Sequence, residues 1–125
     1  MAQAPLETEG DLQLIKEYIL LPMLLDVLER DIQALGTVKL KMDVVYVKAL
    51  RSAQNVITAD IALLRKRMRG RGIKVYEQQR TEWGIEARYL CRGYHHSFSM
   101  LWGLVKAELS QYLSKYLNVD LRSSL

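Results

Sequence analysis

The residues best suited to chemistry lie in one short basic run, residues 65–74. The run reads RKRMRGRGIK, and six of its residues are cations: Arg65, Lys66, Arg67, Arg69, Arg71 and Lys74. Guanidinium and ammonium groups clustered in this way neutralise phosphates, so they are typical of a surface that binds nucleic acid. Aromatic side chains that follow the run would stack on bases: Tyr76, Trp83, Tyr89 and Tyr94. The six cations are the candidate nucleic-acid contacts that the sequence offers.

The same run also has a structural interpretation. Cations are favoured at the C-terminal end of a helix, where they complement the helix dipole. Residues 1–36 carry a net charge of −5, whereas residues 37–80 carry +8. The two segments can therefore neutralise each other, within one chain or across a dimer. Under this interpretation, four cations of the run meet the acids of the first helix: Arg65, Lys66, Arg67 and Arg69.

Cys91, His95 and His96 form the cluster with metal-ligand chemistry. A thiolate and imidazoles are ligands that zinc prefers. Their spacing matches no recognised zinc motif, and on a helix His96 would point about 100° away from the other two. Nor does the sequence show a third group that would orient a cysteine–histidine pair for nucleophilic catalysis. We therefore expect a buried thiol beside two histidines, and we assign no metal and no cofactor.

Motifs of other enzyme classes are absent from the sequence. It contains no Glu-x-x-His pair of the kind that holds a di-iron centre in a helical bundle. The segment Gly70-Arg71-Gly72 lacks the third glycine and the preceding strand of a dinucleotide-binding loop. We therefore expect no catalytic residues, and we expect that the protein is not an enzyme.

Apolar periodicity predicts two long helices before residue 70. The first begins near Thr8, whose hydroxyl can form a capping box with Asp11. Pro22 removes a backbone donor inside this helix, so we expect a kink or a break there. Gly36 is placed to end the helix in a left-handed conformation. A second helix is predicted from Asp43 to about residue 69.

The second helix carries an apolar seam along its whole length. Seven residues alternate three and four apart: Val47, Leu50, Gln54, Ile57, Ile61, Leu64 and Met68. Five more widen this face: Tyr46, Ala49, Ala53, Val56 and Leu63. An antiparallel hairpin of the two helices needs a third element to cover such a face. Apolar surface that three helices cannot bury is expected to become a dimer interface.

The pattern changes after Gly72, where apolar and polar residues alternate with a period of two. This alternation predicts a short β-hairpin over residues 73–92. An alternative stays open, in which the last helix begins earlier, because six positions also fit a helical spacing: Ala87, Leu90 or Cys91, Tyr94, Phe98, Leu101 and Val105. Gly84 and Gly93 bound the second strand and favour the hairpin.

The last helix is predicted over residues 94–117, with a core stripe that includes Phe98, Leu101, Trp102 and Val105. The predicted fold is therefore mainly α. It has three long helices, the first kinked at Pro22, and a short β-hairpin between helices two and three. The 125 residues form a single helical domain with frayed ends at about 1–7 and 118–125.

Cysteine count and hydropathy bear on the compartment. With Cys91 as the one cysteine, no disulfide framework is possible, so a reducing cytoplasm is the simplest location. The acidic N-terminal segment has no features of a signal peptide. The most apolar stretch, residues 19–25, contains Pro22 and is too short to span a bilayer. We expect a cytoplasmic protein without membrane contact.

Three short segments resemble small, uncharacterised, mostly helical proteins of Bacillus-type bacteria. The resemblance rests on Pro5-Leu6-Glu7-Thr8-Glu9, on Leu21-Pro22 followed by Leu28-Glu29-Arg30-Asp31, and on Leu90-Cys91-Arg92-Gly93-Tyr94. It covers about half of the chain and implies no catalytic residues.

Together these features predict a small non-enzymatic module of protein interaction or regulation. We expect it to bind a protein partner or a second copy of itself through hydrophobic seam positions. The alternative is a nucleic-acid-binding protein that uses the basic run 65–74 and the hairpin after it.

Overall fold

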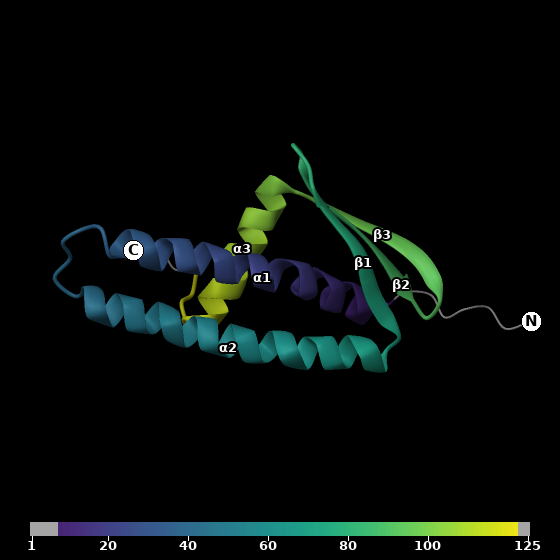
Figure 1. The fold of residues 1–125 in the computed structure, drawn as a ribbon, viewed down its shortest axis with the longest axis horizontal. Coiled ribbons are helices and arrows are strands. Elements are labelled where there is room, and N and C mark those ends of the chain that lie inside the picture. Colours follow the sequence, from purple (N-terminus) through teal and green to yellow (C-terminus); the bar gives the residue numbers. More distant parts are fainter. Residues whose placement is uncertain (1–7, 123–125) are drawn as a thin grey trace, which may run out of the picture.

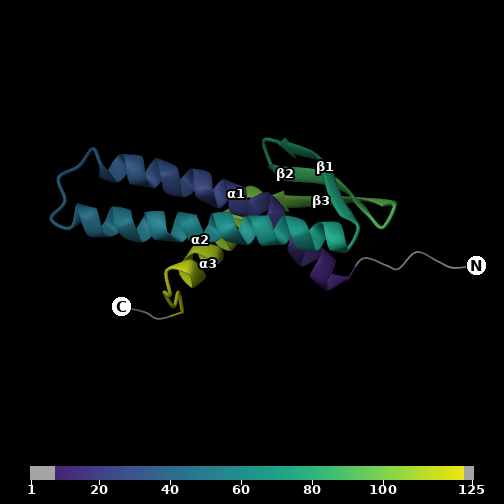
Figure 2. The same cartoon turned by 60° about the horizontal axis from the view of Figure 1, so that its bottom comes forward.

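The computed structural model describes residues 8–122. Along the chain it contains two long helices, three strands and a third helix (Figure 1). The elements are α1 (Glu9–Leu35), α2 (Asp43–Gly70), β1 (Ile73–Arg80), β2 (Gly84–Cys91), β3 (Tyr94–Leu101) and α3 (Trp102–Tyr116). The first two helices lie side by side and antiparallel, the sheet covers one end of this pair, and α3 crosses it (Figures 1 and 2).

Helix α1 begins as the sequence predicts. The Thr8 hydroxyl accepts a hydrogen bond from the backbone N–H of Asp11, and the Asp11 carboxylate accepts one from the backbone N–H of Thr8. The helix then continues through Pro22 without a break. The expectation for Gly36 is wrong, because its φ of −71° is right-handed. The reversal of the chain is made by the loop of residues 36–42.

Helix α2 spans almost the predicted residues and pairs with α1. Ile57, Ile61, Leu64 and Met68 of the predicted seam are buried, in company with Ala53. The polar seam position is also accounted for, because the Gln54 amide donates a hydrogen bond of 3.3 Å to the Glu29 carboxylate. Arg51 also donates to Glu29, and these bonds, the one from Arg51 foremost, lower the pKa of Glu29 to about 2.

The prediction of a two-stranded hairpin is wrong, because the sheet has three antiparallel strands in the order β1-β2-β3. Residues 94–101, which we expected in the last helix, form β3. The turn between β2 and β3 consists of Arg92 and Gly93, both with positive φ (50° and 88°). Two central residues of this kind make the tight turn whose twist matches a hairpin. Gly93 therefore reverses the chain between two strands instead of preceding a helix.

Helix α3 is shorter than predicted, with 15 residues from Trp102 to Tyr116. The sheet takes the eight residues that would have lengthened it. Of the predicted frayed ends, residues 1–7 and 123–125 lie outside the described part of the chain. After α3 the chain turns at residues 117–118, where Asn118 has a φ of 57°, and again at residues 121–122. Among the described residues, no helix combines the length and apolar character that crossing a membrane requires.

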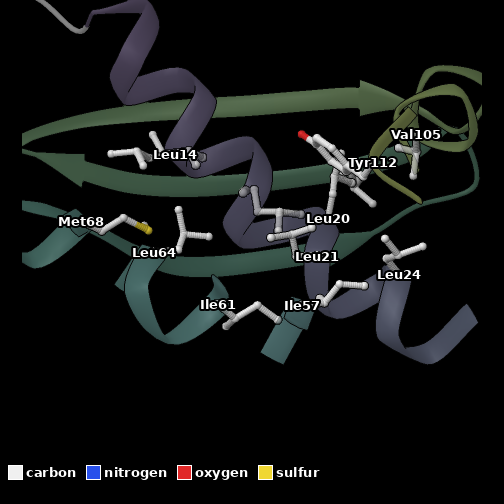
Figure 3. Packing of buried hydrophobic residues seen from close by; sticks show 14 of the residues in the cluster. Leu14, Leu20, Leu21, Leu24, Ile57, Ile61, Leu64, Met68, Val105 and Tyr112 are labelled. Carbon is white, nitrogen blue, oxygen red and sulfur yellow. The ribbon is translucent and has the colours of Figure 1, made fainter. Parts of the chain in front are cut away.

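The core lies where α1, α2, α3 and the inner face of the sheet meet. Figure 3 shows Leu20 and Leu24 of α1 near Ile57 of α2 and near Val105 of α3. Strand β2 contributes alternate residues to this core: Ile85, Ala87, Tyr89 and Cys91. The far end of the α1–α2 pair, which includes the loop 36–42, extends beyond α3 and the sheet (Figures 1 and 2).

Candidate functional site

The six cations of the basic run do not form one patch. Helix α2 ends inside the run, and the chain turns at Gly72, where φ is +68°. Met68 and Ile73 are buried within the run, so its cations project around them in different directions. Arg67 lies on the side of α2 that faces α3. Arg65, Arg69 and Lys74 line a groove on another side.

Arg71 belongs to a buried ion cluster around Asp11. The Asp11 side chain is 1% exposed and lies at the start of α1. Its Oδ2 accepts a hydrogen bond of 2.8 Å from Nη2 of Arg92, and its Oδ1 lies 3.3 Å from Nη1 of Arg71. The hydrogen bond from Arg92 holds the pKa of Asp11 well below its usual range, and the bonds with Thr8 also lower it, although burial opposes them. Arg71 therefore has a structural partner inside the fold.

The loop after α2 also binds the tight turn of the sheet. The backbone N–H of Arg92 donates a hydrogen bond of 2.8 Å to the carbonyl of Gly72, and its Nη1 donates to the carbonyl of Arg71 at 3.3 Å. Three segments distant in sequence thus meet at Asp11: the start of α1, the end of α2 and the β2–β3 turn. This cluster positions the sheet on the helices.

The other five cations of the run lack ion pairs with carboxylates in the described part of the chain: Arg65, Lys66, Arg67, Arg69 and Lys74. The expected pairing of the first four with acids of the first helix is therefore wrong for residues 8–122. Exposed acids on α1, such as Asp26 and Asp31, face solvent instead. Asp11, in the first turn of α1, is bound instead by Arg71 of the loop after α2 and by Arg92 of the β2–β3 turn.

A groove of about 230 Å³ lies beside the end of α2. Arg65 and Arg69, one helical turn apart, line it together with Lys74 of β1. Tyr18 of α1 also lines it, and its floor is apolar, with Met68, Ile73 and Val75. Three cations and one aromatic ring around a shallow groove form an arrangement that can contact phosphate.

A cleft of about 260 Å³ lies between α1, α2 and α3. Arg67 and Lys115 line it with Glu17 and Asp60, so its charges balance. The Tyr116 hydroxyl donates a hydrogen bond of 2.7 Å to Asp60, and burial together with this carboxylate raises the pKa of Tyr116. The cleft therefore links α2 to α3 with polar contacts.

The sheet separates the three residues of the metal-like cluster. Cys91 is buried on the inner face of β2. On β3, His95 lies on the outer face, where its Nδ1 is 2.9 Å from the Tyr76 hydroxyl, whereas His96 stacks on Tyr89 on the inner face. Within residues 8–122 no three His, Cys, Asp or Glu side chains gather in a way that could hold a metal ion.

A second apolar seam runs along the exposed side of α2. Its residues alternate four and three apart and carry no charge: Val45, Ala49, Ser52, Val56, Ala59 and Leu63. All six are exposed, and the three largest are about half exposed, with 55% for Val45, 51% for Val56 and 54% for Leu63. We call these six residues the α2 seam. This spacing is typical of a helix that packs against another helix along a coiled-coil interface.

The sequence pattern indicates part of this seam but places it in the core. Ala49, Val56 and Leu63 are expected to widen the buried face of the second helix, and Val45, Ser52 and Ala59 are not singled out by that pattern. A signal is present in Val44-Val45-Tyr46-Val47, because four consecutive apolar residues cannot all face one side of a helix. What the pattern could not give is the length of α3, which determines how much of α2 is covered.

Comparisons with known proteins found one family. A family model described as YhjD protein matches residues 6–121 of the chain. No match was found among curated proteins or among solved structures. The family match agrees with the resemblance to a small protein family that the sequence showed.

Proposed function

The chain belongs to the YhjD protein family, and we propose that it is a non-enzymatic protein-interaction module that associates with a second copy of itself through the α2 seam. The observation that carries this proposal is a complete heptad pattern left exposed on a helix of 28 residues. A heptad seam is the shape that one helix presents to another. A single copy leaves all six residues exposed, with Leu63 at the rim of the cleft beside α3.

The seam fits a second copy because it is self-complementary. In an antiparallel pair centred between Ser52 and Val56, each residue meets one of suitable size. Val45 then lies opposite the partner's Leu63, Ala49 opposite the partner's Ala59, and Ser52 opposite the partner's Val56. Large residues meet at the two ends, and each pair between them contains at least one small residue, Ala or Ser, so the helices can approach closely. The seam spans 19 residues, about 27 Å of helix, which is long enough for a specific interface.

The absence of charge along the seam also favours a second copy of the chain as the partner. In a pair of identical surfaces related by a two-fold axis, a charged residue near the axis lies close to the same charge on the partner. None of the six seam residues is charged, although Lys48, Arg51 and Asp60 lie close by on the same helix. A second copy therefore meets no electrostatic opposition along the seam itself.

The proposal is tested by Val56→Glu, which places a carboxylate at the centre of the seam in each copy. Glutamate is a better helix former than valine, so the isolated chain keeps its fold. Sedimentation velocity over a range of concentrations should show self-association of the native chain. Val56→Glu should weaken association by about a hundredfold, because two buried charges oppose each other near the two-fold axis.

Val119→Glu is the matched control. Val119 has nearly the same exposed fraction as Val56, 53% against 51%, but it follows α3 and is not one of the six seam residues. This variant should associate like the native chain. Equal weakening by both variants, or no effect of Val56→Glu on association, would rule out the seam as the interface.

Nucleic-acid binding is the second candidate function, and the groove beside α2 favours it. Arg65, Arg69 and Lys74 line this groove, and none has a carboxylate partner in residues 8–122. Tyr18 offers a ring for stacking at the same place. Binding to mixed DNA and RNA fragments at low and physiological salt tests it, since phosphate contacts make affinity fall steeply with salt.

The setting we propose for either function is the cytoplasm. The thiol of Cys91 is buried in the core, and Cys91 is the one cysteine of the sequence. A reducing compartment keeps such a thiol intact. Fractionation of cells that express the tagged chain would test this location.

A further inference from the structure

The two edges of the sheet differ in how they resist pairing with another strand. Edge β1 carries charged residues at Lys74, Glu77 and Arg80, and its register shifts between Val75 and Glu77. Charges and bulges on an edge strand are devices that prevent pairing with another chain. The edge nearest α2 is therefore protected.

Edge β3 has neither device. Its eight residues, YHHSFSML, include no Asp, Glu, Lys, Arg or proline. Its register with β2 runs from Gly84 opposite Leu101 to Cys91 opposite Tyr94 without a shift. In the described part of the chain β2 is its one neighbouring strand, so the backbone groups along the other side of β3 face outward (Figure 1).

We propose that β3 is a second self-association surface, which pairs antiparallel with β3 of another copy to form one continuous six-stranded sheet. This inference rests on the proposed function only for the number of copies that assemble. The pairing at β3 itself follows from features of the sheet alone.

The partner strand that fits best is β3 of a second copy, because a two-fold axis places apolar residues beside apolar ones and polar residues beside polar ones. His96, Phe98 and Met100 are half-buried on the inner face, and the last two pack against the core. Ser97 and Ser99 are exposed on the outer face. With the axis at Phe98, Phe98 meets the partner's Phe98, and Ser97 meets the partner's Ser99. Apolar residues extend the apolar row and polar residues extend the polar row.

The lack of charge also favours a second copy. Identical strands paired by a two-fold axis bring their like charges together, which destabilises the pair. None of the eight residues of β3 is Asp, Glu, Lys or Arg, so two paired copies of β3 bring no such like charges together. It also lies across the sheet from β1, the strand that contacts α2. The two surfaces can therefore be occupied at the same time, and a chain that uses both assembles beyond the dimer.

The test uses two charged variants that the isolated sheet tolerates. Ser97 lies opposite Arg88 of β2, so Ser97→Glu gains an attractive neighbour within its own chain. Ser99 lies opposite Glu86 of β2, so the lysine of Ser99→Lys also gains an oppositely charged neighbour within its own chain. In a pair of identical copies each variant places two like charges near the axis. Either should weaken β3 pairing by about tenfold or more.

An equimolar mixture of the two variants should restore pairing. In the mixed pair the glutamate of Ser97→Glu lies opposite the lysine of Ser99→Lys on the other copy, so repulsion becomes attraction. A purely structural effect of either substitution would not be repaired by mixing. Ser110→Glu, which adds the same charge to the exposed side of α3, should associate like the native chain.

Sedimentation velocity of four chains separates this inference from the proposed function. The native chain should assemble beyond the dimer, Val56→Glu and Ser97→Glu should each stop at the dimer, and the double variant should be a monomer. If Ser97→Glu assembles as far as the native chain, the β3 surface is overturned and the seam stands. If Val56→Glu has no effect while Ser97→Glu gives a monomer, the seam is overturned and β3 stands. A native chain that stays monomeric overturns both.

Discussion

The carboxylate of Asp11 accepts a hydrogen bond of 2.8 Å from the guanidinium of Arg92, 81 positions further along the chain. This contact joins the first turn of α1 to the β2–β3 turn, and Arg71 adds a second cation from the loop after α2. The buried carboxylate of Asp11 therefore adds a polar link between the sheet and the helices to the apolar contacts of the core. The β3 surface depends on this arrangement, since it sets how the sheet lies on the helices.

Asp11 gives the fold a dependence on acid. Because the pKa of Asp11 in the folded chain lies below the value near 3.9 of an unfolded aspartate, its contribution to stability is present above about pH 4. It is lost as the pH falls below that value toward the folded pKa. Asp11→Asn should cost about 2–4 kcal/mol at pH 7, since it leaves Arg92 without its carboxylate. It should also flatten the fall in unfolding free energy between pH 5 and pH 2.

Urea unfolding at several pH values measures both effects. Asp26→Asn is the control, because Asp26 is exposed and has no ion pair within residues 8–122. It should leave the unfolding free energy and its pH dependence nearly unchanged. An Asp11→Asn chain as stable as the native one at pH 7 would contradict the role given to this cluster.

Gly84 is required by the close pairing of β2 with β3. A Cβ atom at this position would lie 2.0 Å from the carbonyl oxygen of Met100 and 2.9 Å from Cα of Leu101. Both are backbone atoms, so Gly84→Ala should destabilise the chain by about 3 kcal/mol. Gly103→Ala is the matched control. Around Gly103, no described atom beyond its own helix backbone and chain neighbours lies within 4 Å of a Cβ, and the change should stabilise α3 by about 0.5 kcal/mol.

Thermal unfolding followed by circular dichroism compares these two alanine variants. The melting temperature should fall for Gly84→Ala and rise slightly for Gly103→Ala. A Gly84→Ala chain that melts with the native one would show that β2 and β3 are further apart at this point than the structure has them.

The seam should also respond to a substitution that improves it. Ser52 is the polar member of the α2 seam, and in the proposed pair it lies opposite the partner's Val56. Ser52→Leu buries one additional apolar side chain from each copy, so the dissociation constant of the dimer should fall by about tenfold. Sedimentation at low concentration measures it. Unchanged association would contradict the proposed position of Ser52 inside the interface.

The groove beside α2 gives a separate prediction for nucleic acid. If the second candidate function holds, replacing Arg65, Arg69 and Lys74 by alanine should abolish most binding. The slope of log affinity against log salt should become shallower by about two to three. Replacement of Lys39, Lys41 and Lys48 removes the same charge elsewhere and should leave binding largely intact. Equal loss in both triple variants would indicate attraction to net charge and no site at the groove.

Local signals in the sequence predicted the helical part of the fold. The Thr8–Asp11 capping box and the core seam of α2 are determined by residues three or four apart, so they can be read without knowledge of the rest of the chain. The long-range contact of Asp11 with Arg92 has no such signal. Both residues are common surface types, and their pairing depends on how the sheet docks.

The third strand was missed because its residues fit two periods. Phe98, Leu101 and Val105 have helical spacing, whereas His96, Phe98 and Met100 alternate as a strand requires. The two positive φ values at Arg92 and Gly93 decide for the strand, because they return the chain along β2. A sequence pattern cannot show that Arg92 adopts this conformation, since arginine seldom does.

The exposure of the α2 seam was not predicted because of that same error, the missed third strand. A last helix over residues 94–117 would be long enough to cover much of α2. The helix of 15 residues that remains after β3 is taken out crosses the hairpin and leaves Val45, Val56 and Leu63 half exposed. The candidate interface was therefore visible only once the secondary structure of residues 94–101 was known.

The most direct test of the seam is a contact between Val45 and Leu63 of two different copies. Within one chain these residues lie 18 positions apart on the same helix, about 27 Å, which is beyond the range of a nuclear Overhauser effect. We predict methyl cross-peaks between Val45 and Leu63 in a sample that mixes chains labelled at valine with chains labelled at leucine. Associated protein that shows no such cross-peak would contradict the α2 seam as the interface.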